Sequence, residues 1–134
     1  MKRIFLAIVM FHFLPSFQAQ YELKKEVNGL QVFTKWSHEK WWSKKSDKVL
    51  LVKVANTNEV AVSYDLGIEF YKDLQMVEES KAENYCLGAH KSILPRWKGI
   101  VFKPSPEVRD VFDSFELTGL DVEKLSGISC TQEP

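Results

Sequence analysis

The segment from Lys35 to Lys45, KWSHEKWWSKK, has the residue types most suited to binding, with three tryptophans, one histidine and four lysines against one glutamate. Exposed indole rings favour burial against a partner or stacking on a sugar, and lysines attract anionic groups. The segment therefore predicts a contact surface for a protein or, alternatively, for a glycan. The candidate residues are Trp36, His38, Lys40, Trp41, Trp42, Lys44 and Lys45.

The same segment has a purely structural interpretation, in which it is the end of a β-strand and its tryptophans cover one open end of a small sandwich. Side chains alternate between the two faces of a strand, so Trp36 and Trp42 would share a face that Trp41 does not. Trp36 also shares the parity of Leu30 and Val32, which is typical of a core tryptophan. The segment is a binding surface only if the indoles are exposed.

Catalytic patterns are not found in the sequence. After residue 19 the chain has two histidines, His38 and His90, and neither lies in a GxSxG or HExxH arrangement. Glu78 and Glu79 are adjacent and would point to opposite faces of a strand. The six glycines are dispersed, so no phosphate-binding loop is predicted. We therefore expect a non-enzymatic protein without a cofactor or metal.

The two cysteines, Cys86 and Cys130, are predicted to form one disulfide bond in an oxidising compartment. The bond would close a loop of about 45 residues, which corresponds to about 4 kcal/mol in the chain-entropy model. A redox pair, or a metal site that uses Cys86 with His90, is the alternative. It lacks both a CxxC spacing and further ligands.

The N-terminus has the layout of a secretory signal peptide. Lys2 and Arg3 precede an apolar run over residues 4–14, Pro15 and Ser16 end the run, and Ala19 is suited to cleavage. The run is too short to cross a bilayer, which takes about 18 to 20 apolar residues, and no transmembrane segment is predicted. We expect a signal peptide at 1–19 and one domain at 20–134, exported to the periplasm, the outer envelope or the medium.

Removal of Lys2 and Arg3 leaves 16 basic and 18 acidic side chains, a net charge of −2, which argues against a nucleic-acid partner. The charge is uneven, with six lysines and two acids over residues 35–53 and seven acids and two bases from residue 107 onward. Such a distribution can steer a charged partner, although uneven charge also arises by chance. The acidic C-terminal third is a second candidate surface.

Strict alternation over residues 60–70, VAVSYDLGIEF, predicts a long strand with one buried face. The apolar, β-branched run over residues 48–55 predicts another strand, and the Asn-Thr-Asn sequence after it predicts a hairpin between the two. Lys72-Asp73 indicates a second turn, so that three consecutive strands form an antiparallel meander.

Further strands are expected over residues 30–36, in WKGIVFKP up to Pro104, and over residues 114–122. In the last of these the apolar parity slips at Gly119, which predicts a β-bulge. Ser105 and Pro106 are suited to the start of a short helix. The pattern predicts an all-β fold, an antiparallel immunoglobulin-like β-sandwich of about seven strands with one short helix.

The succession LLVKVANTNEVAVSYDLGIEFYKDLQMVEES followed by CLGAHKSI resembles the middle of small bacterial exported domains with immunoglobulin-like folds. The match covers about residues 48–103 and rests on an apolar strand, an Asn-X-Asn turn and an amphipathic strand that ends in aromatics. The resemblance implies a fold and an envelope or extracellular setting, and it assigns no catalytic residues.

Together these features predict a non-catalytic interaction module or accessory subunit of a protein assembly in the cell envelope or outside the cell. The alternative is a small carbohydrate-binding protein in which Trp41 or Trp42 is the stacking platform.

Overall fold

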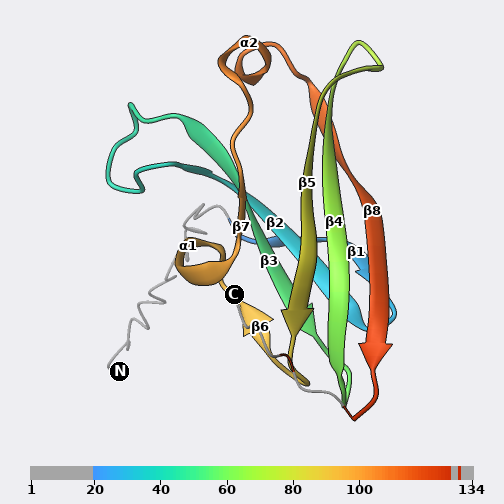
Figure 1. The fold of residues 1–134 in the computed structure, drawn as a ribbon. Helices are drawn as coiled ribbons and strands as arrows, with labels where there is room; N and C mark the ends of the chain where they lie inside the picture. The colour runs from blue at the N-terminus through green and yellow to red at the C-terminus, as the bar shows by residue number, and fades with distance from the viewer. Residues whose placement is uncertain (1–19, 128–129, 131–134) are drawn as a thin grey trace, which may run out of the picture.

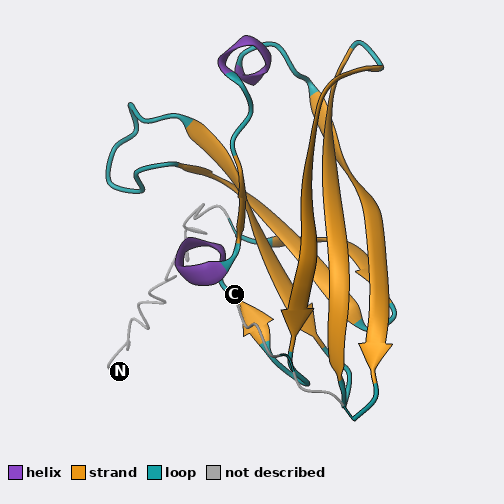
Figure 2. Ribbon diagram, viewed as in Figure 1, coloured by secondary structure: helices purple, strands orange, loops and turns teal. Residues whose placement is uncertain are grey.

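The computed structural model describes residues 20–127 and Cys130. The predicted signal peptide, residues 1–19, lies outside the described residues. The described chain forms two antiparallel sheets that face each other, together with two helices of a single turn (Figures 1 and 2). The prediction of an all-β fold with antiparallel strands is confirmed.

The five-stranded sheet contains β1 (Glu22–Val27), β2 (Leu30–His38), β3 (Lys48–Asn56), β6 (Ser92–Ile93) and β7 (Ile100–Phe102). The three-stranded sheet has the order β5-β4-β8, with β4 (Ala61–Lys72) between β5 (Gln75–Leu87) and β8 (Ser114–Leu125). The helices are α1 (Pro95–Lys98) and α2 (Pro106–Arg109). Helix α2 confirms the helical turn predicted after Ser105, and α1 was not predicted.

The core lies between the two sheets and draws on alternate residues of their central strands. On β4 every second side chain from Val62 to Phe70 is at most 3% exposed, which confirms the predicted alternation. These side chains form one cluster with Leu30, Val32 and the even-numbered residues of β3 from Leu50 to Val54. Burial of this apolar surface drives the association of the sheets, at about 25 cal/mol per Å².

The predicted irregularity at Gly119 is present. Asp65 of β4 faces Asp121 of β8 and Gly67 faces Thr118, so β8 has one extra residue between the two pairs. Gly119 has φ +56°, a left-handed conformation that glycine adopts without steric penalty. The slip in apolar parity is therefore a β-bulge.

Two tight turns set the register of hairpins within the sheets. The predicted turn after Lys72 is confirmed, since Lys72 pairs with Gln75 and both residues between them have positive φ. A second such turn, at Asn28-Gly29, joins β1 to β2. Asn-Gly is the preferred pair for this turn geometry, and strand β1 before it was not predicted.

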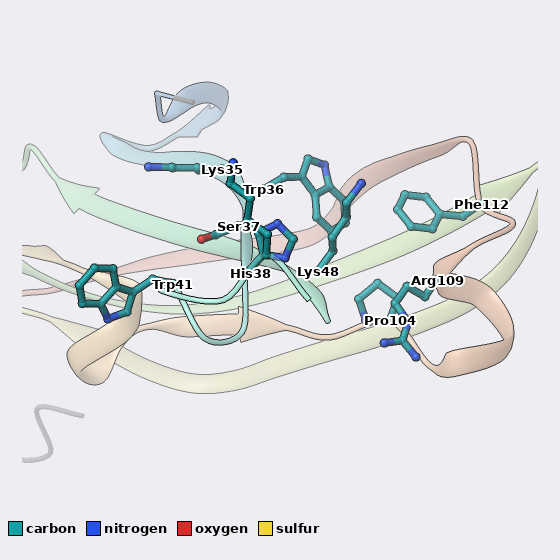
Figure 3. A pocket seen from close by; sticks show the side chains of 10 residues that line it. Lys35, Trp36, Ser37, His38, Trp41, Lys48, Pro104, Arg109 and Phe112 are labelled. Carbon is teal, nitrogen blue, oxygen red and sulfur yellow. The ribbon is translucent and has the colours of Figure 1, made fainter. Parts of the chain in front are cut away.

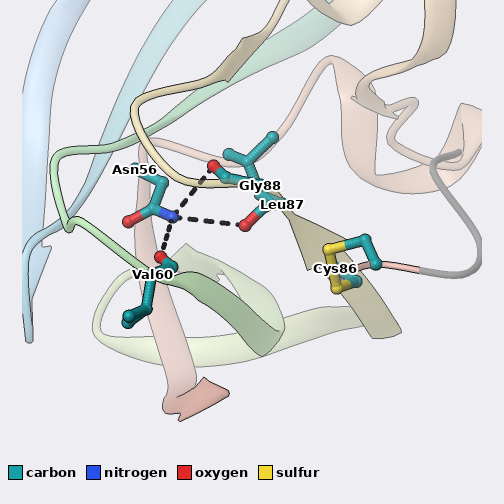
Figure 4. The surroundings of a disulfide bond; sticks show 6 residues. Asn56, Val60, Cys86, Leu87 and Gly88 are labelled. Carbon is teal, nitrogen blue, oxygen red and sulfur yellow. Dashed lines mark hydrogen bonds between the residues drawn. A yellow bond between two sulfur atoms is a disulfide. The ribbon is translucent and has the colours of Figure 1, made fainter. Parts of the chain in front are cut away.

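The predicted hairpin between β3 and β4 is wrong, because these strands belong to different sheets. The link between them crosses the sandwich and is organised by Asn56, which is 2% exposed (Figure 4). The Asn56 side-chain nitrogen lies 2.9 Å from the carbonyl oxygen of Val60, 3.2 Å from that of Leu87 and 3.0 Å from that of Gly88. Its side-chain oxygen accepts a hydrogen bond from the backbone N–H of Asn58. A buried amide thus replaces a hairpin ladder and connects the two sheets.

The connectivity also differs from that of constant-type immunoglobulin domains, whose second and third strands lie in different sheets. Here β2 and β3 pair along their whole length, from Leu30 opposite Asn56 to His38 opposite Lys48. The described chain has eight strands and two single-turn helices, where about seven strands and one helix were expected. What the structure shows is a two-sheet antiparallel sandwich with its own strand order.

The predicted disulfide bond joins Cys86 on β5 to Cys130, with 5.6 Å between their Cα atoms (Figure 4). It connects two residues of the same chain that are 44 positions apart. The bond removes the thiolate that a metal site at Cys86 and His90 would need, and His90 instead faces Glu59, with Nε2 2.9 Å from a carboxylate oxygen. Neither helix in the described part of the chain is long and apolar enough to cross a bilayer.

Candidate functional site

The candidate surface is built on the connection between β2 and β3. The two strands pair as far as His38 and Lys48, and residues 39–47 form a loop beyond the end of the sheet (Figure 1). We call residues 39–47 the Trp/Lys loop. Most of the predicted site residues lie on this loop, while Trp36 and His38 lie on the strand that leads into it.

Hydrogen bonds within the Trp/Lys loop give it a defined shape. The backbone N–H of Glu39 donates to the carbonyl of Asp47 at 2.8 Å, which closes the base of the loop. The Ser46 hydroxyl accepts from the backbone N–H of Lys40 at 3.0 Å and donates to the carbonyl of Ser43 at 2.8 Å. Internal bonds of this kind hold the loop side chains in place before any partner binds, which lowers the entropy lost on binding.

His38 supports this loop. Its Nδ1 lies 2.9 Å from the carbonyl oxygen of Ser46, and because a carbonyl only accepts, the ring donates from Nδ1. The side chain is half-buried. His38 was predicted to be part of the contact surface, and the structure places it at the base of that surface as a bracing residue.

Arg96 braces the loop from the other side, and sequence reasoning missed it. Its guanidinium donates to the Ser37 hydroxyl at 2.7 Å, to the carbonyl of His38 at 2.9 Å and to the carbonyl of Glu39 at 3.2 Å. Arg96 follows Pro95 in α1, almost 60 residues after its partners. No local pattern in the sequence indicates such a contact.

The three tryptophans separate into two groups. Trp36 packs against the core, with its ring centroid 5.4 Å from that of Phe112 and 5.7 Å from that of Phe115. Trp41 and Trp42 lie on the loop and are 72% and 70% exposed, with their rings edge to face at 5.6 Å. Trp36 is partly buried against the core, on the face that its parity indicated, and of the three tryptophans only Trp41 and Trp42 are largely exposed.

Exposure of two adjacent indoles is unusual for an isolated domain. Tryptophan buries more apolar area than other side chains, and water disfavours exposed apolar surface by about 25 cal/mol per Å². Exposed apolar patches of this kind mark contact sites with other molecules. The condition under which the segment is a binding surface, exposed indoles, is met by Trp41 and Trp42.

The lysines of the loop add a positive field. Lys40, Lys44 and Lys45 are exposed, and none of them has an ion pair with another residue in the described part of the chain. The two acids of the Trp/Lys loop, Glu39 and Asp47, in contrast, form ion pairs with bases outside the loop. The Lys103 Nζ atom lies 3.1 Å from a carboxylate oxygen of Glu39 and 3.1 Å from one of Asp47, and the Arg109 guanidinium also pairs with Asp47. Because both carboxylates are neutralised, the loop presents its lysines without an opposing charge.

An open hollow of about 1160 Å³ lies beside the loop (Figure 3). Trp41 lies at one end of it, and Phe112 and Arg109 lie toward the other. Its charged lining is entirely basic and consists of Lys35, Lys44, Lys48 and Arg109. The hollow combines aromatic faces with cationic groups, a lining suited to an anionic or partly apolar ligand surface.

No protein-family model matches the chain, and no significant similarity to a curated protein or to a solved structure was found. The interpretation of the Trp/Lys loop therefore rests on its own geometry.

Proposed function

We propose that this protein is an exported, non-catalytic interaction module, or accessory subunit, that contacts a protein partner in the cell envelope or outside the cell. The observation that carries the proposal is the pair of exposed indoles, Trp41 and Trp42, on a braced loop whose lysines have no opposing charge. Tryptophan leads the residue types that dominate binding energy at protein interfaces, and charges around it steer association.

Export is supported by the signal-peptide layout of residues 1–19 and by the disulfide bond, which persists in oxidising compartments. The resemblance of residues 48–103 to small bacterial exported domains agrees with this setting. The two packed antiparallel sheets support the proposal, because sandwiches of immunoglobulin-like architecture, which do not all share one topology, serve as domains on many cell surfaces.

Replacing both indoles, Trp41→Ser with Trp42→Ser, is expected to lower partner capture by at least about tenfold. Truncating a central tryptophan typically lowers the binding free energy of an interface by about 2 kcal/mol or more. The free energy of unfolding should change by less than about 0.5 kcal/mol, since both side chains are exposed. Quantitative affinity capture from the native source and urea unfolding measure the two effects.

The matched control is Met76→Ser with Val77→Ser, which removes two other exposed apolar side chains, 54% and 40% exposed, from the start of β5. This variant should capture the partner as well as the wild type. Undiminished capture by the tryptophan variant would contradict the proposal.

A glycan is the second candidate partner, because Trp41 lines the hollow and an exposed indole face can stack on a sugar ring. Titration with oligosaccharides separates the two functions. A glycan site predicts a change in tryptophan fluorescence that is largely insensitive to salt, whereas a lysine-steered protein contact weakens as salt rises.

A further inference from the structure

The outer face of the three-stranded sheet is strongly acidic. Even-numbered residues of β4 from Val62 to Phe70 are buried, so the odd-numbered ones point away from the core, and their cross-strand neighbours do the same. We call this surface the acidic face. Its carboxylates are Asp65 and Glu69 on β4, Glu79 and Glu83 on β5, and Glu116, Asp121 and Glu123 on β8. One base, Lys81 of β5, lies among them opposite Gly67, and its Nζ is 3.1 Å from a carboxylate oxygen of Glu79.

Several of these carboxylates lie directly opposite one another. Glu69 faces Glu79 on one side and Glu116 on the other, and Asp65 faces Asp121. Like charges in direct cross-strand opposition destabilise a sheet. These charges also affect Tyr71. A hydrogen bond with Glu69 and the charges of Glu69 and Glu116 raise the pKa of Tyr71 to about 12. The acidic face thus carries more negative charge than Lys81 offsets, even though Asp65 accepts a hydrogen bond from the backbone N–H of Asn84 and Glu69 accepts one from the Tyr71 hydroxyl.

The centre of the acidic face is hollowed, with a volume of about 390 Å³, because two glycines line it. A Cβ atom on Gly67 would lie 2.9 Å from the Thr118 hydroxyl and 3.2 Å from the Thr118 carbonyl oxygen, so a larger residue there would fill part of the hollow and displace Thr118. Gly119 contributes bare backbone at the bulge. Bare backbone on a sheet face is a surface on which an aromatic ring can lie.

A metal ion does not fit this arrangement. The described residues contain no group of three or more acids, histidines or cysteines close enough to share an ion. The carboxylates are spread across three strands, which suits a broad cationic surface.

A surface with the complementary features is present on the same chain. The Trp/Lys loop presents the exposed rings of Trp41 and Trp42 beside the lysines Lys40, Lys44 and Lys45. Resting on the proposed function of that loop, we propose that the acidic face binds the Trp/Lys loop of a second copy of this chain. The lysines would offset the opposed carboxylates, and an indole would lie over the glycine-lined hollow.

The two surfaces belong to different layers of the sandwich. The loop extends from β2 and β3 in the five-stranded sheet, whereas the acidic face points outward from the three-stranded sheet (Figure 1). A contact between unlike surfaces leaves one free loop and one free face at the ends of an open assembly, whereas two copies that exchange loops about a two-fold axis, or a closed ring, leave none. Assembly should therefore give either a closed dimer or ring of fixed size or open chains that grow with concentration.

Sedimentation velocity on the oxidised protein lacking residues 1–19 tests the proposal. At about 20 mM salt, where the Debye length is roughly 20 Å, we expect concentration-dependent assembly, and at about 300 mM salt, where it is roughly 6 Å, we expect dissociation. Lys44→Glu with Lys45→Glu should weaken assembly by at least about tenfold, and so should Glu116→Lys with Asp121→Lys. Combining the four changes in one chain, or mixing the two variants, should restore assembly.

The matched control for the loop variant is Lys72→Glu with Lys124→Glu, which lowers the net charge by the same amount at exposed lysines that line neither hollow. It should assemble like the wild type. A protein that stays monomeric at low salt and high concentration, or a mixture of the two variants that fails to assemble, would overturn the proposal.

Different results would contradict the self-assembly and the proposed function. A wild-type protein that stays monomeric yet captures another protein through the Trp/Lys loop would contradict the proposed self-assembly and would leave the proposed function intact. If the tryptophan variant retains all binding, to itself and to others, both are wrong.

The acidic-face variant makes a second, independent prediction. Glu116→Lys and Asp121→Lys each turn like-charge pairs into opposite-charge pairs, so this variant should melt about 2 to 5 °C higher than the wild type even though it no longer assembles. Melting is compared at about 300 mM salt and low protein concentration, where both proteins are monomeric. A lower melting temperature would show that the carboxylates serve the fold, and would overturn the proposal.

Discussion

Replacing Asn56 by leucine is expected to lower the free energy of unfolding by about 3 to 5 kcal/mol. Leucine keeps the volume of the side chain, so the loss comes from polar groups that remain buried without partners. The carbonyl oxygens of Val60, Leu87 and Gly88 lose a donor, and the N–H of Asn58 loses its acceptor. Urea unfolding of the oxidised protein measures the change.

Asn58→Ala is the matched control at the same link. Asn58 donates to Asn56 and to the carbonyl of Asn28, but it is only half-buried, so water can replace what it loses. Its removal should lower the free energy of unfolding by about 1 kcal/mol. If Asn56→Leu were no more harmful than this control, the buried amide would not be what joins the two sheets.

Removing the disulfide bond, Cys86→Ser with Cys130→Ser, is expected to lower the free energy of unfolding by about 4 kcal/mol. The bond closes a separation of 44 residues, and its main effect in the chain-entropy model is to restrict the unfolded chain. Melting curves with and without a reductant measure the effect. Neither cysteine lines the hollow beside the Trp/Lys loop, so the folded variant should still bind its partner.

The reductant gives an internal control for this prediction. It should lower the melting temperature of the wild type toward that of the serine variant, and it should leave the serine variant unchanged. A wild type that melts at the same temperature with and without the reductant would contradict a stabilising role for the bond.

Local patterns predicted those elements that local physics determines. The alternation over β4 reflects one buried and one solvated face, and the slip in parity at Gly119 reflects a real bulge. The hairpin after Lys72 follows in the same way from the residues of its turn. These features depend on neighbours in sequence, so the sequence expresses them directly.

The link at Asn56 is a feature that local sequence patterns could not predict. Asn-Thr-Asn is a valid turn sequence, but turn residues do not tell whether the next strand stays in the same sheet or crosses to the other. That choice depends on Leu87 and Gly88, more than 30 residues away, whose carbonyls need the Asn56 amide. The Asn28-Gly29 turn, in contrast, could have been recognised from the sequence.

In the candidate site, too, local sequence patterns predicted some features, whereas others depend on residues far away in the sequence. The Trp/Lys segment was recognised from its composition, and the parity of Trp36 with Val32 correctly indicated that Trp36 packs against the core. Exposure of Trp41 and Trp42 depends on a loop whose base is held by Arg96. The charge of that loop depends on Lys103, which neutralises Glu39 across 64 residues. Contacts at this range have no signature in a single sequence.

The central claim is that Trp41, Trp42 and the neighbouring lysines form the surface that contacts a protein partner. The most direct test is amine crosslinking of the tagged, oxidised protein in its native source, followed by mass spectrometry of the crosslinked lysines. We expect a stoichiometric partner whose crosslinks fall on Lys40, Lys44 or Lys45 and are lost with the Trp41→Ser and Trp42→Ser changes. A stoichiometric partner crosslinked only elsewhere, or no protein partner in a folded and oxidised preparation, would contradict the claim.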